Sequence, residues 1–282
     1  MSSLPRSELI APPHQARENK PKIKKKRASD NVADRLRSEI ISGRLPVGSR
    51  LLPERKLAEV LGVSRVTVRS AIATLQSEQL LDVLRGSGIT VLDFRRSSSI
   101  DIYEWLMVGE LQDKEQQYNI FNQVVEVRRN IAIQTLFQAV GKVTDEFRVE
   151  LRRLIEKQRK LIGDPEAYFF GDLELTQAIA RQADNIFVEL LHNSLKRAML
   201  ARMELVLAFM GNPEDHFDGY SIIMGLFDQG PEIANNLEIQ QQATQLIGAF
   251  EAQGLLRVRK LIEELNLNQT DSAPPGLFQK GQ

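Results

Sequence analysis

The chain has 282 residues, equal numbers of basic and acidic side chains, and a hydrophobic share of 42%. This length and composition suit a globular protein with two domains, each with its own core. The absence of cysteine excludes disulfides, thiolate catalysis and cysteine-ligated zinc. A membrane span needs roughly 20 apolar residues in a row, and the sequence has no such run. The start also lacks the apolar core of a signal peptide. We therefore expect a cytoplasmic protein without a membrane segment.

The zero net charge hides an uneven distribution along the chain. Residues 1–96 carry 19 Lys and Arg against 10 Asp and Glu, whereas residues 97–282 carry 18 against 27. A basic first third on an acidic remainder is typical of a protein that meets DNA with one end only. Much of the basic excess lies in residues 20–27, within a polar segment, 1–28, that we expect to be a disordered tail. These basic residues either keep the chain in solution or contact DNA phosphates, and the sequence leaves both readings open.

Residues 31–42 and the segment that begins at Leu51 predict three helices. The second helix begins at Pro53, a residue suited to a first helical position, and ends at Gly62, which can adopt the left-handed conformation of a helix stop. Ser64 can cap the third helix. An apolar stripe at helical spacing on this third helix predicts a buried face, and it consists of Val68, Ile72 and Leu75.

Two arginines, Arg65 and Arg69, lie one turn apart beside this apolar stripe. A helix with an apolar back and guanidinium groups near its N-terminus can enter the major groove of DNA. Two short apolar runs follow the third helix, and the segment Arg85-Gly-Ser-Gly88 that joins them predicts a β-hairpin. Three helices and a hairpin wing make a winged helix-turn-helix domain, which we expect over residues 29–93.

A series of short motifs runs through residues 31–92: Leu45-Pro46-x-Gly48, Leu52-Pro53-x-Arg55-x-Leu57-Ala58, Gly62-Val63-Ser64-Arg65-x-Thr67-Val68-Arg69, Ala71-Ile72, Leu75, and the wing glycines Gly86 and Gly88. With these motifs, the segment resembles the DNA-binding domain of the GntR family of bacterial transcriptional regulators. One position departs from the family, because Gln79 stands where a glycine usually precedes two leucines.

The resemblance implies roles for seven residues of this domain. Three arginines would contact phosphates and guanine edges, two hydroxyl side chains would contact phosphates or bases, and the tip of the wing would reach the minor groove. Arginine can read guanine through two parallel hydrogen bonds, which suits this assignment. In the order of these roles, the residues are Arg55, Arg65 and Arg69; Ser64 and Thr67; and Arg85 and Gly86.

Beyond a linker at residues 94–99, helical periodicity continues almost throughout the chain. The patterns cover 113–141, 144–163, 165–182, 185–209, 213–228 and 231–264, each bounded by Gly, Asn or Pro. No series of alternating strands interrupts them, which favours helices over an α/β effector domain. We therefore expect a mainly α protein, with an all-α bundle of six or seven helices at residues 100–266 and a flexible tail at 267–282.

This bundle is similar to the FCD effector domain of the FadR branch of the same family. Residues 100–106 look like its first short helix. The segment Glu126-Val-Arg-Arg-Asn-Ile131 matches the helix with the ligand-facing arginine, here Arg128. The segment Asp172-x-x-x-Thr176, followed by Asn185, matches the signature Asp-x-x-x-His…Asn except at its histidine.

Many FCD domains hold a divalent metal through that aspartate and three histidines. Here Thr176 stands at the first histidine position, and Tyr220 and either Gln241 or Gln242 stand at the others. The chain has three histidines: His14 falls in the tail, and His192 and His216 fall at positions that do not match, as ordinary core or surface histidines would. The resemblance therefore implies a bundle without metal or other cofactor.

Arg128 lies within the apolar arc of its predicted helix, whereas Arg129 lies on the opposite face and is expected to be solvated. A buried guanidinium needs an anion. That anion is either an acidic side chain of the bundle or a carboxylate or phosphate of an effector. Asp172, Thr176 and Tyr220 complete the effector site that we expect.

These features predict a transcriptional regulator rather than an enzyme. As a homodimer it would bind a pseudo-palindromic DNA operator. An effector in the bundle, either a fatty acyl-CoA or a small organic acid, would favour a head spacing that does not match the two half-sites. The residues do not fix whether the protein is a repressor or an activator. The alternatives are a DNA-binding protein whose bundle only dimerises, and a regulator fused to an enzyme, for which the bundle is too short.

Overall fold

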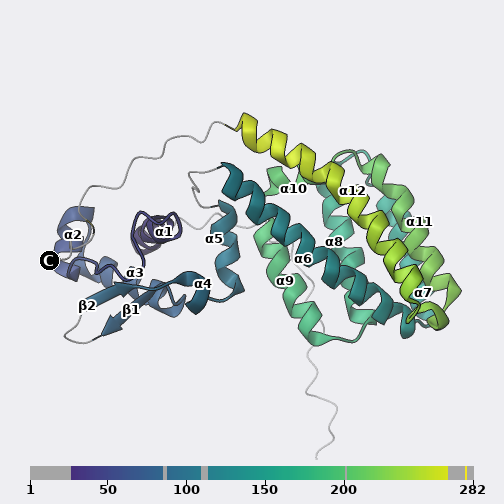
Figure 1. The fold of residues 1–282 in the computed structure, drawn as a ribbon, viewed down its shortest axis with the longest axis horizontal. Helices are drawn as coiled ribbons and strands as arrows, with labels where there is room; N and C mark the ends of the chain where they lie inside the picture. Colours follow the sequence, from purple (N-terminus) through teal and green to yellow (C-terminus); the bar gives the residue numbers. More distant parts are fainter. Residues whose placement is uncertain (1–26, 85–87, 109–113, 201, 266–276, 278–282) are drawn as a thin grey trace, which may run out of the picture.

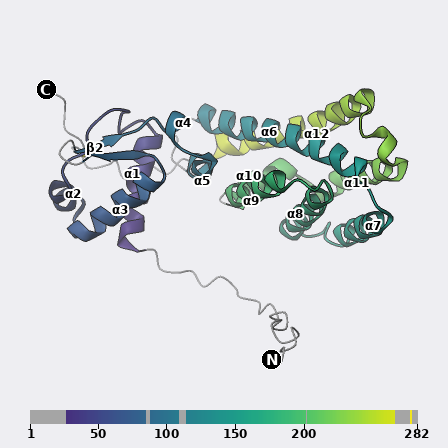
Figure 2. The same cartoon turned by 90° about the horizontal axis from the view of Figure 1, so that it is seen from below.

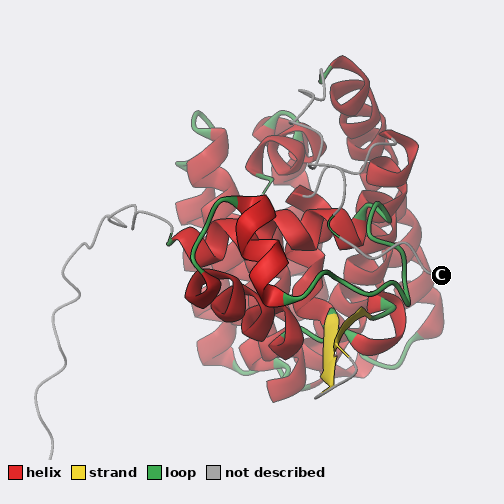
Figure 3. Cartoon of the chain, turned by 90° about the vertical axis from the view of Figure 1, so that its left-hand side faces the viewer, coloured by secondary structure: helices red, strands yellow, loops and turns green. Residues whose placement is uncertain are grey.

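The computed structural model describes residues 27–84, 88–108, 114–200 and 202–265, and residue 277. Figure 1 shows a small head, coloured purple to blue, beside a larger bundle of helices coloured teal to yellow. Helices make up most of the molecule, and the two short strands of the head are drawn in yellow in Figure 3. The prediction of a mainly α protein is confirmed. No helix of the described residues is long and apolar enough to cross a membrane.

The head is a winged helix-turn-helix, as predicted. Its elements are α1 (Ala28–Ile41), α2 (Glu54–Leu61), α3 (Arg65–Ser77), and strands β1 (Leu81–Leu84) and β2 (Gly88–Val91). The strands are antiparallel, with Leu81 opposite Val91. Leucines and valines from all three helices are fully buried together with the inward side of the wing, so the head has a core of its own.

The turn between α2 and α3 follows the prediction in its two central residues. Gly62 ends α2 with a φ of 66°, and Ser64 caps α3 by accepting a hydrogen bond from the backbone N–H of Thr67 at 3.1 Å. The hydroxyl groups of Ser64 and Thr67 also lie 2.8 Å apart. Pro53 differs slightly, because it precedes α2 as its N-cap residue. These contacts hold the exposed start of α3 in one orientation.

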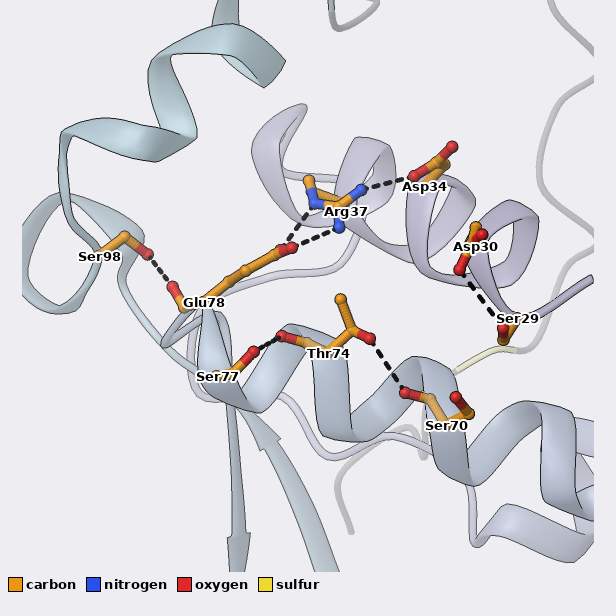
Figure 4. Close-up of polar contacts among 9 residues, drawn as sticks. All are labelled: Ser29, Asp30, Asp34, Arg37, Ser70, Thr74, Ser77, Glu78 and Ser98. Atoms are coloured by element: carbon orange, nitrogen blue, oxygen red, sulfur yellow. Dashed lines mark hydrogen bonds and ion pairs between the residues drawn. The ribbon is translucent and has the colours of Figure 1, made fainter. Parts of the chain in front are cut away.

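The connection at residues 94–99 is attached to the head, which corrects its description as a plain linker. It contains the one-turn helix α4 (Phe94–Ser97). The hydroxyl of Ser97 donates to the backbone carbonyl of Gln79, and the hydroxyl of Ser98 donates to that of Glu78, both at 2.8 Å. Figure 4 shows the contact of Ser98 with the end of α3.

The bundle begins with the short elements η1 (Ile100–Ile102) and α5 (Tyr103–Val108). It continues with α6 (Lys114–Gly141), α7 (Asp145–Arg159), α8 (Pro165–Gln182), α9 (Ile186–Leu200), α10 (Met203–Met210), α11 (Pro213–Gln229), η2 (Pro231–Ile233) and α12 (Leu237–Glu264). The predicted helix 185–209 is thus two helices, and 231–264 begins with a separate turn. After the short elements η1 and α5, the described part of the bundle has seven helices, α6 to α12, which is the larger of the two numbers expected.

The two longest helices, α6 and α12, lie side by side in Figures 1 and 2 and pack along much of their length. On their other side, α7, α8 and α11 enclose an aromatic core around Tyr168, Tyr220 and Phe227. This arrangement leaves α9 and α10 beside α8 and places α5 between the head and α9.

Leu277 corrects the prediction of a flexible C-terminal tail at that position. Its side chain is buried in the core of the head, and its carbonyl accepts a hydrogen bond from the backbone N–H of Leu52 at 3.2 Å. The other residues of the predicted tails, up to 26 and from 266, lie outside the described residues. At residue 277, the chain has therefore returned from the bundle to the head.

Gln79 has a left-handed backbone, with a φ of 58°. A side chain in this conformation costs roughly 1–2 kcal/mol, whereas glycine adopts it freely. We expect Gln79→Gly to raise the free energy of unfolding by about 1 kcal/mol after the greater entropy of the unfolded glycine chain is subtracted. Gln76→Gly, within the exposed side of α3, is the matched control and should lower it by about 1 kcal/mol. Urea denaturation of both variants compares them, and equal losses would contradict the strain at residue 79.

Candidate DNA-binding surface and effector cavity

The exposed side of α3 gathers the residues that the sequence assigned to DNA. Ser64 and Arg65 are exposed at its start, and the side chain of Arg69 is 70% exposed one turn later. Thr67 is half-buried because its hydroxyl faces Ser64. The opposite side of the helix is buried in the head. A single helix face therefore presents two guanidinium groups and a hydroxyl to solvent.

Glu54 at the start of α2 holds the guanidinium of Arg69 across the turn. The shortest contact joins Nη2 of Arg69 to Oε2 of Glu54 at 2.9 Å, and Nε also donates to this carboxylate. The pair orients Arg69 along the exposed surface of the head. Arg55, the third arginine of the predicted set, is exposed on α2 with Nε 4.0 Å from the carboxylate of Glu59, a spacing that contributes little at the surface.

Val66 is a candidate contact residue that the sequence reasoning did not assign. Its side chain is 79% exposed, although it is apolar and lies between Arg65 and Thr67 at the start of α3. An exposed valine on a recognition helix can contact the methyl group of a thymine. The signal in the sequence was an apolar residue that falls outside the buried stripe of its helix.

The remaining predicted DNA contacts belong to the wing tip and the basic tail. Arg85 and Gly86 at the tip of the wing lie outside the described residues, as do residues 20–26 of the basic tail. The strands that lead to the wing tip are described, and Leu84 pairs with Gly88 at the end nearest to it. The hairpin predicted for this segment is therefore confirmed up to its tip.

A cavity of about 160 Å³ lies in the bundle between α6, α8 and α9. Most of its lining is apolar, and polar side chains enter from each of the three helices. Those from α6 and α8 include three residues that the sequence assigned to the effector site, Arg128, Asp172 and Thr176. Helix α9 adds His192 and Lys196, which the sequence reasoning did not assign because the position of α9 beside α8 depends on tertiary packing.

A buried carboxylate on α12, that of Glu251, binds both arginines of α6. Its side chain is 2% exposed, with Oε2 3.0 Å from Nη1 of Arg129 and Oε1 3.4 Å from Nη2 of Arg128. Arg129 was predicted to be solvated, and this is wrong, because α12 covers the side of α6 that the helical pattern left open. One carboxylate cannot neutralise two guanidinium groups, so Arg128 brings positive charge to the cavity while it retains an internal partner.

His192 faces this positive charge. Burial lowers its pKa below the usual range, the charges of Lys196 and Arg128 lower it further, and the charge of Asp172 opposes them. The imidazole is therefore mostly neutral at pH 7. Its Nε2 atom is buried without a hydrogen-bond partner among the residues that the structure describes. A neutral histidine with an unused ring nitrogen can donate to, or take a proton for, a bound anion.

Asp172 is held by a phenol from α11. Tyr220 Oη donates to Asp172 Oδ1 at 2.7 Å, and Gln158 Nε2 donates to Tyr220 Oη at 3.2 Å. Burial, followed by the charge of Asp172, raises the pKa of Tyr220, which keeps its hydroxyl protonated. The hydroxyl of Thr176 instead donates to the backbone carbonyl of Asp172 at 2.9 Å. Thr176 and Tyr220, which stand where many FCD domains have histidines, thus make hydrogen bonds within the bundle.

The predicted effector residues divide between two cavities. Tyr220 and His216 line a second cavity of about 350 Å³ between α11 and α12, and Asp172 lies at the boundary and lines both. Gln241 and Gln242, expected at the last metal-ligand position, are exposed and line neither, which corrects that placement. Among the described residues, no three His, Asp or Glu side chains form a group that could hold a metal ion.

Comparison with known proteins agrees with both domains. The profile of the bacterial regulatory proteins of the gntR family matches residues 28–91, and the profile of the FCD domain matches residues 123–230. A regulatory protein of the L-lactate dehydrogenase operon from Escherichia coli is 32% identical over 191 residues, which cover 64% of this chain and 71% of that protein.

Two further relatives are named as regulators. The transcriptional regulator Mce2R of Mycobacterium tuberculosis is 27% identical over 62% of this chain and 72% of its own length. A fatty acid metabolism regulator protein from Erwinia tasmaniensis is 27% identical over 56% of this chain and 63% of its own length. The chain belongs to the GntR family: it is a DNA-binding transcriptional regulator with an FCD effector-binding domain, and not an enzyme.

Proposed function

We propose that two copies of this chain bind a pseudo-palindromic operator, each with α3 in the major groove of one half-site. The observation that carries this proposal is the rigid start of α3, where the Ser64 cap supports an exposed face with Arg65 and Arg69. Each chain supplies one such helix, so a two-fold site needs a homodimer. Thr67 and Arg55 flank this face and would contact phosphates, and Arg85 and Gly86 would reach the minor groove.

Selection of bound duplexes from a random DNA pool tests the operator proposal. The full chain should enrich two inverted half-sites at a fixed spacing of about one helical turn or a multiple of it. Analytical ultracentrifugation of the complex should find two chains on each selected duplex. Enrichment of a single half-site by one chain would contradict the dimeric arrangement and leave only the monomeric contact of α3 with DNA.

Arg69 and Val66 are expected to read different bases. Arg69→Ala should weaken operator binding by about 1–3 kcal/mol and relax preference at one guanine. Val66→Ala should cost on the order of 1 kcal/mol, and only on operators with thymine at the contacted position. Fluorescence anisotropy with operators substituted at one base pair at a time measures both effects.

Neutralising Lys24, Lys25 and Lys26 to Gln is the control for contacts that do not depend on sequence. It should weaken binding to all duplexes alike and flatten the dependence of affinity on salt concentration. Identical behaviour of the Arg69 and lysine variants would contradict a division between base reading and phosphate contact.

For the effector, we propose an organic anion with an apolar body that binds in the cavity between α6, α8 and α9. Arg128 and Lys196 would bind its carboxylate or phosphate, His192 would add a hydrogen bond, and the apolar lining would contact the rest. A small organic acid is favoured because the cationic side chains enter a cavity of only about 160 Å³. A fatty acyl-CoA is the second candidate, supported by the named fatty acid regulator among the relatives and by the second apolar cavity next to Asp172.

This effector would bind without a metal. The donor set around Asp172 supports the proposal, because Tyr220 is a protonated phenol that donates to the carboxylate and Thr176 donates to the backbone. A divalent transition metal prefers imidazole nitrogen at such a site. The hydrogen bond from Tyr220 would therefore satisfy Asp172 in place of a cation.

Thermal shift with organic acids, sugar acids and fatty acyl-CoAs tests the effector proposal. A ligand of the site should raise Tm, and Arg128→Gln or Lys196→Gln should weaken its binding by about 1.5–3 kcal/mol. Arg128→Gln should still fold, because Arg129 continues to bind Glu251. Arg153→Gln, an exposed change of equal charge on α7, is the matched control and should have no effect. If no anion raises Tm, the bundle serves dimerisation alone.

The same ligand should bind more tightly as pH falls from about 8 to 6. The pKa of His192 lies below its ordinary value in the free protein, and a bound anion would raise it, so binding takes up a proton. The charges of Asp172, Arg128 and Lys196 also act on the imidazole. His192→Gln should remove the pH dependence, and its persistence would assign the proton to another group.

A further inference from the structure

One buried guanidinium, that of Arg37 in α1, connects α1 to the end of α3. The residue is 2% exposed. Its Nε and Nη2 atoms donate to the two carboxylate oxygens of Glu78 at 2.7 and 2.6 Å, and Nη1 donates to Asp34 at 2.8 Å. Glu78 is the residue that ends α3, the helix we place in the major groove. Figure 4 shows the guanidinium between these two carboxylates.

The flat face of the same guanidinium packs against α5, the first helix of the bundle. Its central carbon is 3.8 Å from the centroid of the Trp105 ring, which belongs to α5. A guanidinium over an indole is attracted by the electrons of the ring, most strongly where water is excluded. The hydrogen bonds of Arg37 lie in its plane and leave both faces free, so the stack on Trp105 does not compete with the bond to Glu78. Arg37 therefore contacts α1, α3 and α5 at once.

Helix α9 reaches this region from the effector cavity. Lys196 lines the cavity, and Nη2 of the next residue, Arg197, lies 3.2 Å from Oδ1 of Asp101 in η1, directly before α5. Arg197, Asp101 and Trp105 line one pocket of about 300 Å³ together with Glu78 and Ser98. A shift of α9 would therefore act on both the pocket and the segment that carries Trp105.

We propose that Arg37 and Trp105 are positioning residues that fix the orientation of the recognition helix relative to the effector domain. Bound DNA fixes the position of α3, and the contact of Arg37 with Trp105 passes this restraint to α5 and α9. By reciprocity, an effector beside α9 acts on α3 through the same contact. This second direction rests on the proposed effector cavity, whereas the first needs only DNA binding by the head.

Hydrogen exchange with mass spectrometry of the full chain tests the first direction without any effector. The probe is the DNA duplex that the wild type selects, or its single half-site. We expect saturating DNA to slow amide exchange in α5 and α9 by about five-fold or more in the wild type. In Trp105→Leu, DNA should slow exchange in the head alone, while Trp105→Phe, which keeps an aromatic face, should retain the effect in the bundle.

The controls separate loss of coupling from loss of stability. Phe170→Leu removes an aromatic ring from α8, away from the head, and should leave the slowing in α9 intact. Trp105 is preferred to Arg37 as the test position, because removal of Arg37 breaks the ion pair that joins α1 to Glu78 and endangers folding. The proposal is overturned if DNA protects only the head of the wild type, or if Trp105→Leu retains the slowing in α9.

The fluorescence of the protein reports on Trp105, because it is the single tryptophan of the 282 residues. Arg37→Lys keeps a cation but loses the planar bond to Glu78, and it should shift the emission of Trp105 and increase its quenching by acrylamide. Unchanged emission and quenching would contradict the stack. These readouts need neither a dimer nor an effector. If these readouts change as expected while the operator or ligand experiments fail, the result contradicts the proposed function and leaves the contact between Arg37 and Trp105 standing.

Discussion

Two buried charges, the guanidinium of Arg37 and the carboxylate of Glu251, are the constraint on which this architecture depends. A charge removed from water must be matched by a partner of fixed geometry, so each such group determines where its neighbours lie. Arg37 needs Glu78 and Asp34, which joins α1 to the end of α3. Glu251 needs Arg128 and Arg129, which joins α12 to α6. The apolar cores give each domain its stability, whereas these ion pairs select one arrangement of helices that apolar surfaces alone would allow to slide.

The head could be predicted from the sequence because its determinants are local. A left-handed glycine and a capping serine define the helix-turn-helix within three residues, and the buried stripe of α3 repeats at helical spacing. The glycine that is usual at position 79 also has a local reason, since the backbone of Gln79 is in the region that glycine favours. The helices of the bundle could be predicted for the same reason, apart from the break between α9 and α10.

The candidate effector cavity could be predicted only in part, because its wall forms where α6 packs near α8 and α9, which lie later in the chain. Arg128 and Asp172 were found through the family motif, whereas His192 and Lys196 depend on where α9 packs. The error at Arg129 has the same origin. A single-helix pattern separates a buried face from an exposed face, but α12 covers a second side of α6 and brings Glu251 to it. Polar residues in such second contacts have no periodic signal.

The pairing of Arg69 with Glu54 bears on how the head selects DNA. In the free protein the guanidinium already has a carboxylate partner at 2.9 Å, so a guanine would have to replace that contact before it contributed binding energy. A base with a single acceptor would offer a poorer substitute for the paired arrangement, and the carboxylate itself would repel the DNA backbone. Glu54 would therefore lower the affinity for all DNA but lower it least where Arg69 finds two acceptors. Exchange of one partner for another, rather than the presence of a free arginine, would then supply the discrimination between bases.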